Sequence, residues 1–296
     1  MIIMIVQHSD GFYHNQIAKA IRELGEECTM FSWMKFDFGV IDLFDPERDV
    51  VFIRTGTVQA MRIAYRFERR GFHVLNDARY INLSAQKFIS NIYARANGIP
   101  VPELCVAVDK KHPEIIRDYL RQYEVLVAKP IYSRDMGRHV HRITEQTIEG
   151  DMKLIETIPG TEIMLQNEIQ FARLVRVIVL GKKMIVEATT YDTKHAPDWK
   201  ATVCMNPKAK HYLDVPQKLV ELAQWTNVAF GGEVAYIDFF EQVSGDYVLS
   251  EINHSCGLQH HEKITGVAIR RHIALYLVKR YHQLLPNVPV QRQKVA

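Results

Sequence analysis

The strongest constraint on the fold lies in the first eighty residues, where short apolar runs alternate with segments of helical periodicity. The apolar runs fall at residues 2–6, 28–31, 50–53 and 73–75, and the helical segments at residues 13–24 and 58–70. Strands that alternate with helices in this way are typical of a small open sheet with helices packed on it. We therefore expect an α/β fold at the N-terminal end of the chain.

The pattern changes after Asn76. Residues 77–97 have helical periodicity, with Ser84 as the expected N-cap of the helix that carries Lys87 and Gly98 as its expected C-cap. The prolines at 100 and 102 then force an extended exit. Later strands are expected at residues 103–108, 124–129, 139–143, 163–169, 174–180 and 183–190 and around 233–253, and helices at 113–122, 144–157, 215–228 and 267–285. Mixed strands and helices of this kind predict α+β lobes after the first domain.

Charge and composition exclude several classes of protein. The 296-residue chain carries 37 Lys and Arg against 34 Asp and Glu, and these charges form no run or tail. This balance gives no support to a nucleic-acid or membrane partner. The apolar start lacks a basic segment and a cleavage site, no apolar run reaches the length of a membrane span, and the four cysteines form no CxxC pair. We expect a cytoplasmic protein with free thiols.

Two strand-like runs near the C-terminal end carry the most informative side chains. Residues 232–240 and 247–253 are joined through residues 243–246, and a symmetrical hairpin that pairs Val243 with Asp246 places Asp238 opposite Glu251. Asn253 points to the same face as Glu251 because side chains alternate along a strand. Facing carboxylates repel without a cation, and oxygen ligands of this kind suit Mg²⁺. A pair of solvent-facing acids on an amphipathic hairpin is the simpler alternative.

A second group of polar residues follows other strands. Lys129 ends the apolar run 125–128 and leads into the loop 132–138, a combination that is able to bind phosphate. Residues 166–168, Gln-Asn-Glu, offer acceptors for a base or ribose at the end of another strand. Each of these features also occurs on ordinary protein surfaces, so the order of all of them along the chain carries the argument.

That order resembles the ATP-grasp superfamily, and most closely the RimK-type glutamate ligases and relatives that extend amino-acid carrier proteins. The resemblance covers roughly residues 50 to 280, and its last segment, residues 253–259 and 262–267, is especially similar to the end of that family's active site. The matching segments are Lys87, Ile99-Pro100-Val101-Pro102, Val127-Ala128-Lys129-Pro130, Leu165-Gln166-Asn167-Glu168, Val175-Arg176-Val177, Asp198-Trp199-Lys200, Tyr236-Ile237-Asp238 and Ser250-Glu251-Ile252-Asn253.

The resemblance implies a role for each of these residues. Nucleotide contacts fall to Lys87, Lys129, Ser133, Gly137, Glu168 and Asp198, with Ser133 and Gly137 in a flap over the phosphates. The metal ligands are Asp238, Glu251 and Asn253, which hold Mg²⁺ or, as an alternative ion, Mn²⁺. Arg176 and Lys200 are the implied catalytic residues, with Arg176 at the transferred phosphate or oxyanion. Arg54, Ser255 and Gly257 are implied substrate residues, and Arg54 is suited to hold a carboxylate through two hydrogen bonds.

The sequence departs from the family pattern in four respects. The flap contains Ser133, Arg134, Asp135 and Met136 where relatives hold more glycine, and Leu174 stands where an acidic residue is common. Lys200 replaces a usual arginine, so the charge is kept and the planar fork is lost. Cys256 replaces a usual proline before Gly257. The lysine of the strand and the three metal ligands match the family.

The expected architecture is an ATP-grasp fold of the α/β class. It comprises an N-terminal Rossmann-like pre-ATP-grasp domain at residues 1–80, a central lobe at 81–160 and a C-terminal lobe with the metal-binding sheet at 161–296. The expected reaction uses ATP to convert a carboxylate into an acyl phosphate, which the amine of an amino acid or peptide then attacks. A small molecule, a peptide or a carrier-protein terminus could supply the carboxylate, and the resemblance implies a homo-oligomer.

Two other functions remain open at this stage. An ATP-grasp kinase that phosphorylates a hydroxyl would use the same nucleotide site, and a catalytically silent nucleotide-binding regulator would account for the atypical flap and Leu174. Cys256 has no adjacent base and is expected to be a turn residue rather than a nucleophile. The spacing of His254, His260 and His261 matches no standard zinc pattern.

Overall fold

In the computed structural model, residues 1–7, 12–132, 139–192 and 209–286 are described, and their strands form three sheets. The first sheet is parallel, in the order β2-β1-β3-β4. Its elements are β1 (Ile2–Val6), α1 (Phe12–Glu23), β2 (Cys28–Ser32), the 3₁₀ segments η1 (Trp33–Lys35) and η2 (Phe38–Leu43), β3 (Val50–Arg54), α2 (Val58–Arg69) and β4 (His73–Leu75). The predicted alternation of strands and helices in the first eighty residues is confirmed by this order of elements. The strands β1 and β3 are buried along their whole length.

The segment after the first sheet forms two helices rather than one. These are α3 (Ala78–Ala85) and α4 (Lys87–Ala96), and Gln86 between them has extended backbone angles. Gln86 forms a β-bridge with Tyr132, and the Lys87 N–H donates to the Ile131 carbonyl at 2.7 Å. The prediction that Ser84 caps the Lys87 helix is wrong, because Ser84 lies inside α3 and its hydroxyl donates to the Tyr80 carbonyl. A long-range bridge at Gln86 interrupts a segment whose local pattern favours one helix.

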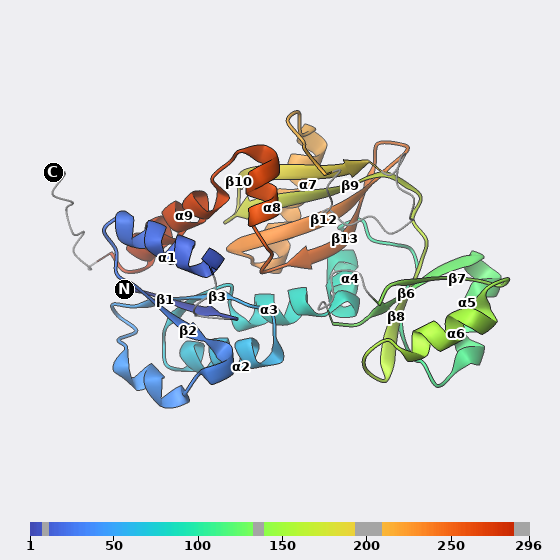
Figure 1. The fold of residues 1–296 in the computed structure, drawn as a ribbon, viewed down its shortest axis with the longest axis horizontal. Coiled ribbons are helices and arrows are strands. Elements are labelled where there is room, and N and C mark those ends of the chain that lie inside the picture. Colours follow the sequence, from blue (N-terminus) through green and yellow to red (C-terminus); the bar gives the residue numbers. More distant parts are fainter. Residues whose placement is uncertain (8–11, 133–138, 193–208, 287–296) are drawn as a thin grey trace.

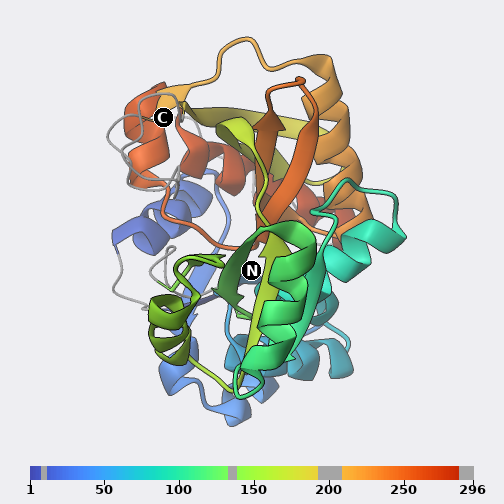
Figure 2. The same cartoon turned by 90° about the vertical axis from the view of Figure 1, so that its right-hand side faces the viewer.

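The second sheet is antiparallel in the order β5-β8-β6-β7, and Figure 2 places it at the front of the molecule. Its elements are β5 (Cys105–Asp109), α5 (Pro113–Tyr123), β6 (Val125–Pro130), β7 (His141–Thr144), α6 (Ile148–Glu156) and β8 (Glu162–Asn167). Leu126, Ala128 and Leu165 pack with both helices in one apolar cluster. Because side chains alternate, Lys129 and Gln166 lie on the opposite face. The chain passes to the third sheet at residues 168–170; the domain boundaries proposed from the sequence stay a prediction.

The third sheet is antiparallel in the order β11-β10-β9-β12-β13. Its elements are β9 (Phe171–Leu180), β10 (Met184–Asp192), β11 (Lys210–His211), α7 (Gln217–Phe230), β12 (Val234–Gln242), β13 (Tyr247–Asn253), α8 (Gln259–Thr265) and α9 (Ile269–Leu284). One face packs against α7, while the other joins the first sheet and α9 in a shared apolar cluster. Figure 1 shows α1 beside α9, so the first and last helices of the chain are packed together.

Asn76 ties the first sheet to the third. Its backbone has φ +57°, a left-handed conformation that asparagine adopts more readily than most residues. The buried side-chain oxygen accepts from the N–H groups of Glu233 and Val234 at 3.1 and 3.0 Å, and the side-chain nitrogen donates to the Val234 carbonyl at 3.1 Å. One side chain therefore sets the start of β12, the strand that carries Asp238.

None of the helices in the described part of the chain is both long enough and apolar enough to cross a membrane.

Candidate active site

The hairpin of β12 and β13 brings Asp238 and Glu251 together as predicted. The two residues are direct partners in the ladder, and Gly245 has the positive φ of +83° that the turn requires. The turn itself is wider than predicted, because Glu241 rather than Gln242 faces Tyr247. The ladder shifts by one residue between Asp238 and Phe239, with Ser250 as the extra residue on β13. This bulge cancels the error at the turn and restores the opposition of the two acids.

Three charged side chains form a row across one face of the third sheet. Arg176 on β9 faces Asp238, and Asp238 faces Glu251. Arg176 donates to Asp238 through Nε at 2.6 Å and through Nη2 at 2.5 Å, and both side chains are 8% exposed. Burial raises the pKa of the Asp238 carboxyl, and the Arg176 guanidinium opposes that rise. The fork geometry fits the bidentate contact that arginine makes with a carboxylate or a phosphate.

Lys87 reaches this row from the first turn of α4. Its Nζ donates to Glu251 Oε1 at 2.7 Å, in a partly buried ion pair between residues 164 positions apart in the chain. The bridge at Gln86 and the N–H bond to Ile131 hold the start of α4 against the end of β6. Lys87 therefore joins the acids of the third sheet to the exit of the strand that carries Lys129.

Lys129 is the most perturbed cation of the site. It is 9% exposed, and its Nζ donates to the neutral Gln166 Oε1 at 2.8 Å. Burial and the nearby charge of Lys87 together lower the pKa of Lys129 to about 8, and Glu251 opposes the change. The ammonium lies 5.9 Å from the centre of the Phe240 ring on β12. Among the described residues no carboxylate pairs with this buried cation, and such a charge is costly, so the position favours an anionic ligand.

Glu168 lies in the short link between the second and third sheets, where the sequence predicted it. Its carboxylate accepts from Arg142 Nε at 2.7 Å and from Nη2 at 3.2 Å. The hydrogen bond to Glu168 raises the pKa of Arg142. Glu168 is thus fixed at the crossing between the two sheets, and its proposed contact with the nucleoside stays a prediction.

The predicted substrate residues gather at the exit of β3. Arg54 Nη2 donates to the Cys256 carbonyl at 2.9 Å, and Nη1 donates to His14 Nδ1 at 2.9 Å. Ser255 Oγ donates to the Arg54 carbonyl at 3.3 Å. Gly257 lies in the same loop, and a side chain there would meet no other atom within 4 Å. The loop after β13 is thus bound to the first sheet, which places Arg54 between the two.

Several predicted residues lie outside the described residues. They are Ser133, Gly137, Asp198 and Lys200, together with the rest of the flap after Tyr132.

The donor set of the predicted metal site fits Mg²⁺. Asp238 and Glu251 face each other, and alternation along β13 puts Asn253 on the side of Glu251. Two carboxylates and an amide oxygen suit an ion that keeps several waters and takes phosphate oxygens as further ligands. Within the described ranges no group of three or more His, Cys, Asp and Glu side chains is placed to hold a metal ion.

Sequence reasoning did not foresee the roles of two buried histidines. His254 Nδ1 lies 2.7 Å from Ser84 Oγ, and a Cβ at Gly56 would come within 2.0 Å of His254 Nε2. His261 Nδ1 lies 3.1 Å from Thr189 Oγ1. Burial lowers the pKa of His254 to about 4 and that of His261 to about 3, so both rings are neutral. Glycine at position 56 is the one sequence signal that could have indicated such a close approach.

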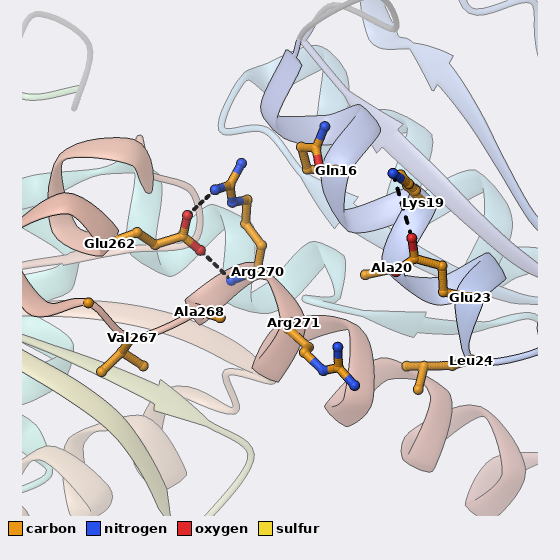
Figure 3. Close-up of a pocket in the computed structure, with 11 residues that line it drawn as sticks. Gln16, Lys19, Ala20, Glu23, Leu24, Glu262, Val267, Ala268, Arg270 and Arg271 are labelled. Atoms are coloured by element: carbon orange, nitrogen blue, oxygen red, sulfur yellow. Dashed lines mark hydrogen bonds and ion pairs between the residues drawn. The ribbon is translucent and has the colours of Figure 1, made fainter.

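A pocket of about 370 Å³ lies elsewhere, between α1 and the turn from α8 to α9 (Figure 3). Lys19 and Glu23 line it from one side, and Glu262, Arg270 and Arg271 line it from the other. Lys19 pairs with Glu23 at 3.7 Å, and Glu262 accepts from the Arg270 N–H at 2.8 Å. None of the residues that the sequence predicted for the site lines this pocket.

Comparisons with known proteins identify the family and the fold. Residues 84–277 match the family profile of the RimK-like ATP-grasp domain. The glutamate–LysW ligase ArgX of Sulfolobus acidocaldarius is 24% identical over 79% of this chain and 83% of the relative. The α-aminoadipate–LysW ligase LysX of Sulfurisphaera tokodaii is 26% identical over 69% of this chain and 72% of the relative. The structure of the ATP-grasp ligase PsnB with a minimal precursor, Mg and ADP superimposes with a TM-score of 0.71 at 15% identity, covering 95% of this chain and 97% of that one.

Proposed function

The chain belongs to the RimK-like ATP-grasp family of ATP-dependent ligases that form amide bonds, and from this premise we propose that it activates a carboxylate as an acyl phosphate and transfers it to an amino acid. The observation that carries the proposal is the row of Arg176, Asp238 and Glu251. Two further cations approach this row: Lys87 from α4 and Lys129 from β6 of the second sheet. Three cations and two acids at one place can bind a triphosphate together with its divalent ion.

The nucleotide is proposed to lie between the faces that carry Lys129 and Glu251. Lys87 and Lys129 would donate to its phosphates, and Glu168 would serve the nucleoside end. Ser133, Gly137 and Asp198 would complete the nucleotide contacts. Asp238, Glu251 and Asn253 would hold Mg²⁺, with Mn²⁺ as an alternative ion. When bound, the ion neutralises charge on the phosphates and makes the terminal phosphorus more electrophilic.

Binding in this way requires the site's own ion pairs to change partners. Lys87 would leave Glu251 for a phosphate, and Arg176 would turn its fork from Asp238 to the transferred group. Asp238 and Glu251 would each lose an ion pair with a side chain and gain the divalent ion instead, so each carboxylate would still contact a positive charge. Arg176, with Lys200, would then stabilise the oxyanion that forms as the amine attacks the acyl phosphate.

The relatives support the class of substrate. The LysW ligases are named for joining an amino acid to LysW, and PsnB was solved with a precursor peptide. We propose that the amine belongs to an amino acid, as in those ligases, and that the carboxylate belongs to a peptide, a carrier protein or a small molecule. A homo-oligomeric state and a cytoplasmic location stay predictions from the sequence.

Mass spectrometry of reactions with ATP, Mg²⁺, amino acids and a panel of carboxylates tests this function. The expected result is a condensed product formed together with ADP. Added hydroxylamine should intercept the acyl phosphate as a hydroxamate. ADP release with a stable phosphate ester and no hydroxamate would instead identify a hydroxyl kinase, and MgATP binding without ADP release across the panel would identify a silent regulator.

A further inference from the structure

The charged row on the third sheet continues onto one more strand. Thr189 on β10 is the direct ladder partner of Arg176 on β9, as Arg176 is of Asp238 on β12. Direct partners on neighbouring antiparallel strands carry their side chains on the same face, with Cβ atoms roughly 5 Å apart. The Thr189 side chain therefore lies beside that of Arg176, on the side away from Asp238 and Glu251.

His261 covers this end of the row. It belongs to α8, which packs against β10 and β11, and its Nδ1 lies 3.1 Å from Thr189 Oγ1. Both residues are fully buried. The other ring nitrogen, Nε2, is buried as well and has no hydrogen-bond partner among the residues that the structure describes. Most buried polar atoms in proteins are paired, so this nitrogen calls for an explanation.

The hydrogen bond at Nδ1 determines what Nε2 can do. A neutral imidazole has one donor and one acceptor nitrogen. In the described part of the chain Nδ1 is the single partner of the Thr189 hydroxyl, so the hydroxyl hydrogen is satisfied only if Thr189 donates to Nδ1. The ring proton then lies on Nε2, which makes Nε2–H a donor without an acceptor. Burial and the nearby Arg176 and His260 together lower the pKa of His261 to about 3, so the ring stays neutral.

The surroundings of this donor favour an oxyanion as the missing acceptor. Arg176 lies on the neighbouring strand, and its fork binds an anionic group, the Asp238 carboxylate. An oxygen that contacts both Arg176 and Nε2–H would carry negative charge, and a neutral donor stabilises it without the cost of burying a second cation. The transferred phosphoryl group is the oxyanion proposed above for Arg176. It would have the metal ligands on one side and His261 on the other.

We propose that His261 binds the transferred phosphoryl group together with Arg176, through a hydrogen bond from Nε2–H to a phosphoryl oxygen on the side away from the metal ligands. Thr189 is a positioning residue, since its hydroxyl holds the ring in the tautomer that donates from Nε2. This contact rests on the proposed ligase function, because the phosphoryl group belongs to that reaction. It gives the buried ring of α8 an acceptor that the described residues do not supply.

The first test measures how strongly inorganic phosphate, the expected product, stabilises the protein against heat in the presence of MgADP. His261→Gln and His261→Asn form a matched pair, because the glutamine amide reaches the position of Nε2 and the asparagine amide only that of Nδ1. Phosphate should bind His261→Gln about as well as the unaltered protein. Its dissociation constant should rise roughly tenfold in His261→Asn, as expected for the loss of one hydrogen bond to a charged group.

A purely structural histidine would give the opposite order. Asparagine would keep the contact with Thr189 and glutamine would lose it, so stronger phosphate binding by His261→Asn than by His261→Gln overturns the proposal. His261→Phe keeps a ring without any nitrogen and should lose as much phosphate binding as His261→Asn. It takes the place of that variant if the asparagine protein does not fold, which the melting temperature without ligand reveals.

The second test addresses the tautomer. Sulfate has no hydrogen to donate, whereas phosphate at neutral pH has one, so a donor at Nε2 binds both ions and the loss in His261→Asn should be similar for the two. A loss seen with phosphate alone would show that Nε2 accepts, and it would overturn the assignment. Thr189→Val keeps the shape of the side chain without the hydroxyl and should weaken phosphate binding severalfold. Thr189→Ser keeps the hydroxyl and should bind phosphate normally; equal binding by both variants would exclude a positioning role for Thr189.

Stabilisation by MgADP alone is measured on the same samples. If MgADP stabilises every variant and phosphate binding does not depend on His261, the His261 contact is rejected and the nucleotide site stands. If MgADP fails to stabilise the unaltered protein while phosphate binding still depends on His261, the proposed function is rejected and the anion contact stands. No stabilisation of the unaltered protein by phosphate would reject the contact.

Discussion

Cations gather at two places in this protein, and the two differ in burial rather than in charge. Lys87, Lys129 and Arg176 meet at the row on the third sheet, where Lys129 and Arg176 are less than a tenth exposed. The pocket of Figure 3 holds Lys19 and Arg271 in exposed positions and a partly buried Arg270. The pocket is a hollow of about 370 Å³, yet its charges are the less costly ones.

The partners of these cations differ as well. Lys19 pairs with Glu23 one helical turn away, and such exposed pairs contribute little to stability. At the row, Lys87 on α4 pairs with Glu251 on β13, and the hydrogen-bond partner of Lys129 among the described residues is the neutral Gln166 side chain. Burial without full compensation marks the row as the place for an anionic ligand.

Replacing Lys129 should have the largest effect. Lys129→Met is expected to lower ligase turnover by on the order of 10³-fold, because a buried cation acts more strongly on a phosphate than a solvated one. The melting temperature should stay the same or rise, since an uncompensated charge is removed. Lys19→Met, which removes a 66% exposed side chain from the pocket, is the control and should keep full turnover. An equal loss of turnover in Lys129→Met and Lys19→Met would show that the row and the pocket do not differ in function.

Replacing Glu251 distinguishes the contribution of the metal ion from the contribution of the phosphate-binding lysines. Glu251→Gln should lower Mg²⁺-dependent turnover by on the order of 10²-fold, because a metal ligand loses its charge. Binding of ATP in the presence of EDTA should become no weaker, since Lys87 is released from its ion pair and remains available to phosphate. Calorimetric titration with and without Mg²⁺ measures both effects. Glu262→Gln releases Arg270 at the pocket instead, and nucleotide affinity that changed there too would contradict the assignment.

The lowered pKa of Lys129 predicts a pH dependence of stability. Below about pH 8 the ammonium is charged in the folded and in the unfolded protein, so its burial destabilises the fold throughout that range. Between about pH 8 and the ordinary value of 10.5, the folded protein releases this proton and the unfolded chain keeps it. The free energy of unfolding should therefore rise by roughly 3 kcal/mol across this window.

The contribution of Lys129 is obtained by subtracting the denaturation profile of Lys129→Met from that of the unaltered protein, since other groups titrate in the same window. Parallel profiles would show that Lys129 has an ordinary pKa and is solvated like the lysine of the pocket.

The smallest effects are expected at the pocket. Arg271→Ala should change the free energy of unfolding by no more than about 0.5 kcal/mol, because the side chain is exposed. Turnover and nucleotide affinity should remain unchanged. Urea denaturation and ADP release measure these quantities, and a loss of turnover in this variant would make the pocket part of the functional surface.

The sequence predicted much of the site because several of its features are local. Opposition of Asp238 and Glu251 follows from strand alternation and a glycine turn, and Lys129 from its place near the end of an apolar strand. The register was right through two compensating errors, since the turn is wider than a symmetrical hairpin and Ser250 bulges from β13. A bulge depends on the neighbouring strand and leaves no reliable signal in one strand's own pattern.

The tertiary structure decided which groups meet and how deeply they lie. The pairing of Lys87 with Glu251, the support of Lys129 by Gln166 and the three hydrogen bonds of the Asn76 side chain join residues far apart in the chain. Residue type and periodicity report which face of an element is apolar, so the sequence by itself determined most of the elements, the class of fold and the acids of the row, but not the break at Gln86. Burial depends on what packs against that face from elsewhere, and therefore only the assembled sheets set the pKa of Lys129.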